Sequence, residues 1–139
     1  MNEVRVSTDQ PIAWWLRPVV LLFAGLFTAG AGIALLRPAM LVSPNDEITG
    51  AVHIFAGYMA ARNLALALML VAMLAMGARR FLGGLMVLSG LIQILDACMD
   101  CFEGRWAVAP GVLVLGLICL LVAGRLCGFP FWRAKSWMS

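Results

Sequence analysis

Residues 81–102 read FLGGLMVLSGLIQILDACMDCF, an apolar run that carries Asp96 inside it and Asp100 near its end. A helix crosses the hydrocarbon core of a bilayer with about 20 predominantly apolar residues, so this run is long enough to span a membrane. A charged carboxylate at the bilayer centre costs at least about 2.5–3.5 kcal/mol. Asp96 is therefore predicted to pair with a cation, to face the protein interior or to take part in chemistry.

Three further apolar runs have a similar length, and they lie at about residues 18–36, 50–77 and 106–126. The polar breaks between the four runs are Arg37-Pro38 with residues 43–47, Arg79-Arg80, and Glu103-Gly104-Arg105. Four spans with short connections use almost all of the 139 residues. We predict an all-α integral membrane four-helix bundle in a single domain, residues 1–139, which leaves no room for a soluble catalytic domain.

The composition supports this class of protein. Hydrophobic residues make up 63% of the chain and charged residues 12%, with a mean hydropathy of +0.97, whereas soluble domains carry about 25% charged residues. The net charge of +3 does not indicate nucleic-acid binding, because the basic residues flank the spans. We therefore expect a multi-pass protein of a plasma membrane or a bacterial inner membrane.

The orientation follows from the distribution of basic residues between the two sides of the membrane. The predicted inner side carries seven of them, namely Arg5, Arg17, Arg79, Arg80, Arg125, Arg133 and Lys135, and the outer side carries two, Arg37 and Arg105. Cytoplasmic segments are enriched in Lys and Arg, so both termini are predicted to be cytoplasmic. A cleaved signal peptide is disfavoured, because the run at 18–36 is longer than the usual apolar region of about 7–15 residues.

Polar residues inside the run at 81–102 follow a helical spacing. Four of them are separated by 4, 3 and 4 residues, which places them on one side of a helix with 3.6 residues per turn. They are Ser89, Gln93, Asp96 and Asp100.

A second group of polar residues lies in the run at 50–77. Tyr58 and Arg62 share a helical face, and Asn63 lies about 100° further round. At about 1.5 Å per residue, Arg62 is about 17 Å from the outer end of its helix and Asp96 about 9 Å. An arginine side chain that points outward covers most of this difference. We predict an Arg62–Asp96 ion pair in the outer half of the bundle, with Tyr58 and Gln93 as hydrogen-bond partners.

Such a pair has two interpretations, a structural lock between helices or a ligand-binding or catalytic site. A structural lock needs only two charged side chains, whereas these two segments supply at least six polar side chains. We therefore favour a ligand-binding or catalytic site. The candidate catalytic residues are Asp96 and Arg62, and the candidate substrate-binding residues are Tyr58, Asn63, Gln93, Asp100 and Thr28.

Cys98-Met99-Asp100-Cys101 has the spacing of a redox-active cysteine pair. Membrane thiol oxidases need a second pair on the same side, and Cys119 and Cys127 lie toward the inner end of the last run. Buried cysteines are also common as small core residues, so the redox interpretation is a minor alternative. The chain has one histidine, and no metal site or cofactor is predicted.

Small residues that recur every four positions indicate where membrane helices pack closely. Two such stripes occur, and we predict a close contact at each. They are Ala24, Thr28 and Gly32 in the first run and Gly57, Ala61 and Ala65 in the second.

A resemblance to a known family covers about residues 57–97. The residues that carry it are GYMAARNLALAL at 57–68, Arg79-Arg80, and QILDA at 93–97. They resemble the small four-helix membrane proteins grouped around DoxX, and are most similar to an uncharacterised sister family with an Arg-(Asp/Asn)-Leu motif on its second helix and an Asp late in its third. Asn63 stands where that family often has an acidic residue. The resemblance implies the four-helix fold and the choice of Arg62 and Asp96.

The predicted function is the binding of a lipophilic small molecule, or its transformation by proton transfer at Asp96, and whether the protein is an enzyme stays open. One alternative is a non-catalytic accessory subunit of a membrane complex. Further alternatives are a small oligomeric transporter, which the lack of an internal repeat disfavours, and a thiol–disulfide redox protein. The expected partners are the lipid bilayer, a lipophilic small molecule, and a membrane-protein partner or further copies of the chain; no nucleic acid is expected.

Overall fold

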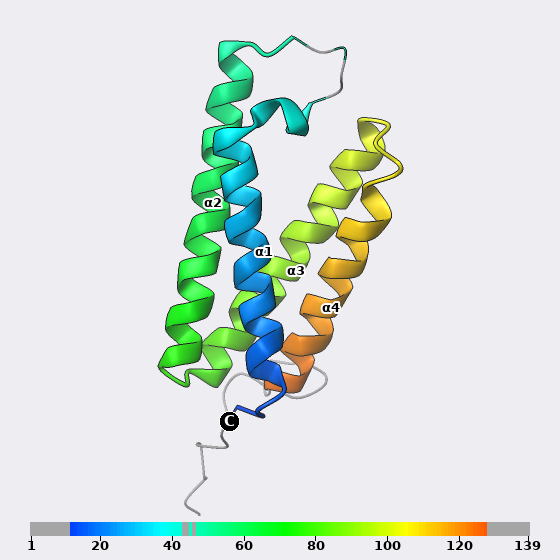
Figure 1. The fold of residues 1–139 in the computed structure, drawn as a ribbon. Helices are drawn as coiled ribbons and strands as arrows, with labels where there is room; N and C mark the ends of the chain where they lie inside the picture. The colour runs from blue at the N-terminus through cyan, green and yellow to red at the C-terminus, as the bar shows by residue number, and fades with distance from the viewer. Residues whose placement is uncertain (1–11, 43–44, 46, 128–139) are drawn as a thin grey trace, which may run out of the picture. The chain divides into compact units, whose positions relative to one another are not determined.

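The computed structural model describes residues 12–42, 45 and 47–127, and every regular element in these ranges is helical (Figure 1). The elements are α1 (Leu16–Leu36), the short 3₁₀ helix η1 (Pro38–Leu41), α2 (Gly50–Ala75), α3 (Arg79–Phe102) and α4 (Ala109–Cys127). The prediction of an all-α protein with four long helices is confirmed for this part of the chain.

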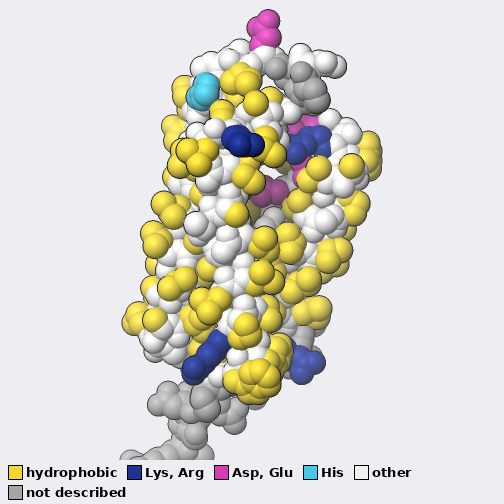
Figure 2. Space-filling view, in the orientation of Figure 1, with side chains coloured by type: hydrophobic (Ala, Val, Ile, Leu, Met, Phe, Trp, Pro, Cys, Tyr) yellow, Lys and Arg dark blue, Asp and Glu magenta, His cyan; other side chains and the backbone are white. Residues whose placement is uncertain are grey.

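All four long helices meet the length and hydropathy that a membrane span requires. They contain 21, 26, 24 and 19 residues, and each is apolar enough to cross a bilayer. In the space-filling view, apolar side chains lie along the whole length of the visible helices, and the charged side chains lie mainly in the upper part of the view and near its lower end (Figure 2). The helices are therefore those of a multi-pass membrane protein by length and composition.

Two predicted helix boundaries were wrong by a few residues. Arg79 and Arg80 were predicted to lie in the break between the second and third helices, but they begin α3, because the chain turns at Gly77. Gly77 has φ 67°, a left-handed conformation that glycine adopts without steric cost. The last helix begins at Ala109, not at about 106, and Pro110 occupies its first turn, where the missing N–H costs nothing.

The structure consists of two helical pairs, and each is described by itself. The pair formed by α1 and α2 runs antiparallel and is joined through η1 (Figure 1). Its core is made of alanines, Ala31 and Ala34 of α1 with Ala56 and Ala60 of α2. Leu41 packs against these alanines from η1. Small side chains let the two backbones approach closely.

Gly32 and Gly57, one glycine from each predicted small-residue stripe, do not lie at close contacts among the described residues. A Cβ atom added at Gly32 or at Gly57 would meet nothing within 4 Å, so both glycines have open space beside them. The tight point is Gly30, where an added Cβ would lie 3.0 Å from Nδ2 of Asn63. The contact face of α2 therefore runs through Ala56, Ala60 and Asn63.

The second pair is formed by α3 and α4, which run antiparallel with extensive contact (Figure 1). The closest approach of its two backbones is at a glycine pair. A Cβ atom added at Gly90 would lie 2.9 Å from the carbonyl oxygen of Gly116, and one added at Gly116 would lie 3.0 Å from the carbonyl oxygen of Gly90. The two backbones thus touch directly, and the sequence analysis did not predict this contact.

Candidate functional site

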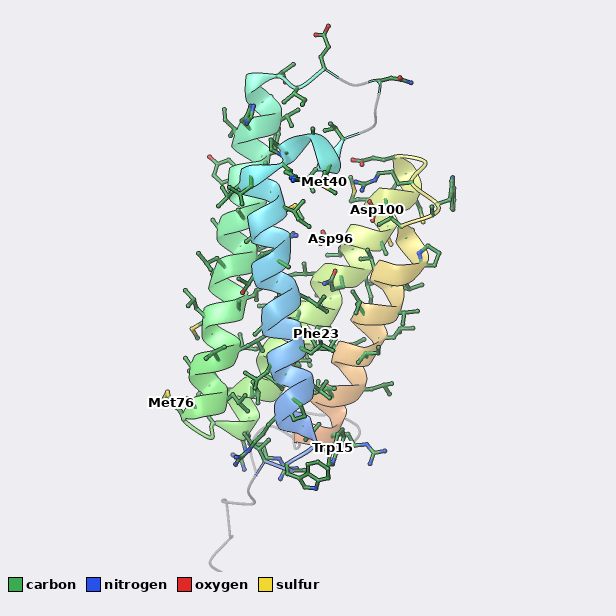
Figure 3. All side chains as sticks on the ribbon, viewed as in Figure 1. Trp15, Phe23, Met40, Met76, Asp96 and Asp100 are labelled. Atoms are coloured by element: carbon green, nitrogen blue, oxygen red, sulfur yellow. The ribbon has the colours of Figure 1, made fainter. Side chains whose placement is uncertain are left out.

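The polar stripe of α3, defined as Ser89, Gln93, Asp96 and Asp100, lies beside the α4 contact. Gly83, Gly90 and Ile94 face α4, since their nearest neighbours include Cys127 and Gly116. At 100° per residue, the stripe lies about 60–120° round the helix from Gly90. Asp96 and Asp100 are about one turn apart on α3 (Figure 3). The stripe therefore lies to one side of the face of α3 that contacts α4.

The part of the stripe nearest the middle of α3 is the most deeply buried. Ser89 has no exposed surface, whereas Gln93, Asp96 and Asp100 are half-buried. Within the described ranges, Oγ of Ser89 has no hydrogen-bond partner. A helical serine or threonine can donate to the carbonyl four residues earlier, as Thr28 does to Ala24 at 2.8 Å. The hydroxyl of Ser89 is thus a buried polar group whose hydrogen-bonding capacity is unused.

Gln93 lies at the border between the stripe and the helix contact. A Cβ atom added at Gly116 would lie 3.2 Å from Cβ of Gln93, so the glycine on α4 makes room for this side chain. The position of Gln93 is therefore coupled to the packing of α3 on α4.

Asp100 is held by an arginine that the sequence analysis counted only as a loop charge. Nη1 of Arg105 lies 3.4 Å from Oδ1 of Asp100, and the backbone N–H of Arg105 donates to the carbonyl oxygen of Asp100 at 2.8 Å. Gly104, with φ 74°, turns the chain so that both contacts form. In the sequence, the signal for this ion pair was two opposite charges five residues apart with a glycine between them. The Asp100 carboxylate is thus anchored at the end of α3.

Several predicted site residues belong to the other helical pair. Asn63 is buried against α1 near Gly30, Tyr58 is 70% exposed, and Arg62 is also exposed. The hydroxyl of Thr28 is engaged within its own helix, which lessens its value as a substrate ligand. The Arg62–Asp96 ion pair would join the two helical pairs, and it stays a prediction.

The four cysteines are free and do not gather at one place. Cys98 is exposed on the side of α3 opposite the polar stripe, and Cys101 lies toward α4. Cys119 is fully buried in α4 at the level of Gly90, about 16 Å along the helix axis from Cys101. Residues 12–42, 45 and 47–127 contain no group of three or more His, Cys, Asp or Glu side chains that could hold a metal ion. The arrangement does not provide the second cysteine pair that a redox relay needs.

Comparison of the chain with protein-family models, with curated proteins and with solved structures found no match. The resemblance to DoxX-like proteins therefore stays a prediction. The case for a function depends on the geometry of α3 and on the distribution of charge along the helices.

Proposed function

We propose that the protein is a multi-pass membrane protein with both termini in the cytoplasm, and that the polar stripe of α3 binds the polar group of a lipophilic small molecule. The observation that carries the proposal is the hydroxyl of Ser89, which is fully buried and has no partner among the described residues. An unsatisfied buried polar group costs about 1–3 kcal/mol. A ligand oxygen or nitrogen that pairs with this hydroxyl recovers that free energy, which gives the stripe a preference for a polar ligand.

The residues of the stripe have different roles in this proposal. Ser89 and the side-chain amide of Gln93 hydrogen-bond the polar group of the ligand in the inner part of the stripe. Asp96, one turn further out, accepts or returns a proton. Asp100 is already paired with Arg105, so it keeps the outer end of α3 in place and takes no part in proton transfer.

Arg62 is part of the proposal because it can compensate the charge of Asp96. A carboxylate in a membrane-spanning helix needs a compensating cation, and Arg62 is the basic residue that the sequence places within a span. A neighbouring guanidinium would compensate the negative charge of the Asp96 carboxylate. Tyr58, one turn before Arg62 on α2, would orient the arginine or the ligand.

The proposal is tested by purifying the protein in a mild detergent and identifying retained small molecules by mass spectrometry. The variants are Ser89→Ala and Gln93→Leu, with Cys98→Ala as the matched control on the opposite side of α3. The two stripe variants should lose the retained molecule, and the control should keep it.

Thermal unfolding of the same samples separates a ligand site from a structural role. If the Ser89 hydroxyl is unpaired in the ligand-free protein, Ser89→Ala should raise the unfolding free energy by about 1–3 kcal/mol, because the variant removes an unsatisfied group. A Ser89→Ala protein that is less stable and retains the same molecules would mean that the hydroxyl has a structural partner. That result would contradict the proposal and favour an accessory subunit.

A further inference from the structure

The pair formed by α3 and α4 has its charges separated between its two ends. The described acidic residues of this pair are Asp96, Asp100 and Glu103, and they lie near the end of α3 where Arg105 is also found. The opposite end carries three arginines, which we call the arginine end: Arg79 and Arg80 at the start of α3 and Arg125 in the last turn of α4. The described side chains thus give this end an excess of positive charge and a positive potential.

Arg79 is fixed in place by the end of the neighbouring helix. Its Nη2 atom donates to the carbonyl oxygen of Arg125 at 3.1 Å, where the C-terminal carbonyls of α4 attract a cation. Its Nε atom is buried and has no hydrogen-bond partner in the described part of the chain. The described residues therefore leave part of the hydrogen-bonding capacity of this guanidinium unused.

The start of α3 adds to the positive potential. Ala78 precedes the helix and provides no side-chain cap, and the first turn contains no acidic residue. The N-terminal N–H groups of a helix carry a partial positive charge that favours an anion. Two arginines thus coincide with a helix end that lacks a negatively charged side chain of its own.

Large apolar side chains flank the arginine end. Met76 in the turn before α3 is 74% exposed, and Phe81 in the first turn of α3 is 72% exposed. A free inorganic anion would gain nothing from this apolar surface. A molecule with an anionic group joined to hydrocarbon chains would contact both the arginines and the apolar side chains.

We propose that the arginine end binds the phosphodiester headgroup of an anionic phospholipid, with the acyl chains along the apolar surface beside Phe81. The inference depends on the membrane location of the protein and is independent of the ligand proposed for the polar stripe. In the predicted orientation, the bound lipid belongs to the cytoplasmic leaflet, whose anionic lipids attract basic segments.

Native mass spectrometry of the delipidated full-length protein, titrated with phosphatidylglycerol or with phosphatidylcholine, tests the proposal. Phosphatidylglycerol should bind more tightly, and the difference should shrink as the salt concentration rises. Arg80→Gln and Arg125→Gln should each weaken binding of phosphatidylglycerol about fivefold, because a basic residue near an anionic surface contributes about that factor. Arg79 is left unchanged because its guanidinium holds the end of α4.

Arg37→Gln is the matched control, since Arg37 is an exposed arginine at the α1–η1 junction. It lowers the net charge by the same amount and should leave the affinity unchanged. Inorganic phosphate at the same concentration should not displace the lipid, which separates a lipid site from a general anion site. Equal affinities for the two lipids, equal losses in Arg37→Gln and Arg80→Gln, or displacement by phosphate would each overturn the proposal.

Discussion

Gly90→Ala is expected to separate α3 from α4 and to destabilise the protein. An added Cβ at this position would lie 2.9 Å from the backbone oxygen of Gly116 and 3.0 Å from two side-chain carbons of Leu120. Ordinary contacts of a Cβ atom begin at 3.4 Å, so the helices must move apart by about half an ångström at this point. The leucine side chain can rotate away, but the carbonyl belongs to the helix backbone and cannot.

The magnitude follows from two opposing effects. Alanine is preferred to glycine inside a helix by about 0.5–1 kcal/mol, which favours the variant. Overpacking at a tight contact costs about 1–3 kcal/mol, which opposes it. Gly111→Ala in α4 is the matched control, because nothing lies within 4 Å of an added Cβ there. Relative to Gly111→Ala, the unfolding free energy of Gly90→Ala should be lower by about 1–3 kcal/mol.

The assay is unfolding in mixed detergent micelles, followed by circular dichroism, for the wild type and both variants. Gly116→Ala should behave like Gly90→Ala, and the double variant should lose less than the sum of the two, because one separation of the helices relieves both contacts. Equal stabilities of Gly90→Ala and Gly111→Ala would show that the two backbones do not touch at this glycine pair, and the packing described for α3 and α4 would be wrong.

Three further predictions use the same preparation or intact cells. Gly83→Ala should lower the melting temperature, because its Cβ collides with the thiol of Cys127, and Gly83→Ala with Cys127→Ala should recover most of the loss; an unchanged loss would contradict the contact. Arg62→Leu and Asp96→Leu should each destabilise the protein, and the double variant should recover part of the loss, whereas strictly additive losses would exclude the ion pair. The orientation is tested in a variant without native cysteines, into which a single cysteine is introduced. The cysteine of Ser139→Cys should react with an impermeant reagent only after the cells are permeabilised, whereas a cysteine in the loop before α4 should react in intact cells. Labelling of Ser139→Cys in intact cells would reverse the proposed orientation.

The number, type and approximate extent of the helices could be predicted from sequence, because a span depends on summed hydrophobicity over about 20 residues. The boundaries at Ala75 and Ala109 depend on local chemistry. α2 ends before its predicted position because Gly77 adopts a left-handed conformation. α4 begins after its predicted position, with Pro110 in its first turn. Such features are single-residue effects within a hydrophobic pattern that is otherwise continuous, so the pattern alone places them within a few residues.

The helix contacts could not be predicted in the same way. Small residues at Gly32 and Gly57 satisfy the spacing of a packing stripe, yet open space lies beside both. The close contacts at Gly30 and Gly90 also involve small residues, but the face that meets a neighbour depends on the crossing of two helices. A helix with many alanines and glycines offers more than one suitable face, and the sequence does not rank them. The pairing of Asp100 with Arg105 was missed for a related reason, since it depends on the turn at Gly104.

The division of α3 into separate sides gives the polar stripe its significance. The closest contacts with α4 are made at Gly83 and Gly90, on a different side of α3 from Ser89 and Asp96, so these two polar residues are not needed to hold the two helices together. Polar residues that cost free energy in a membrane and contribute nothing to this contact require another explanation, and ligand binding supplies one. Ser89 and Gly90 are neighbours in sequence, and each can be replaced by alanine. The two substitutions are expected to change the unfolding free energy in opposite directions. Ser89→Ala should stabilise the ligand-free protein while removing the ligand, and Gly90→Ala should destabilise the α3–α4 contact. If Ser89→Ala and Gly90→Ala both destabilise the protein, the stripe is part of the helix packing, and the ligand site lies elsewhere.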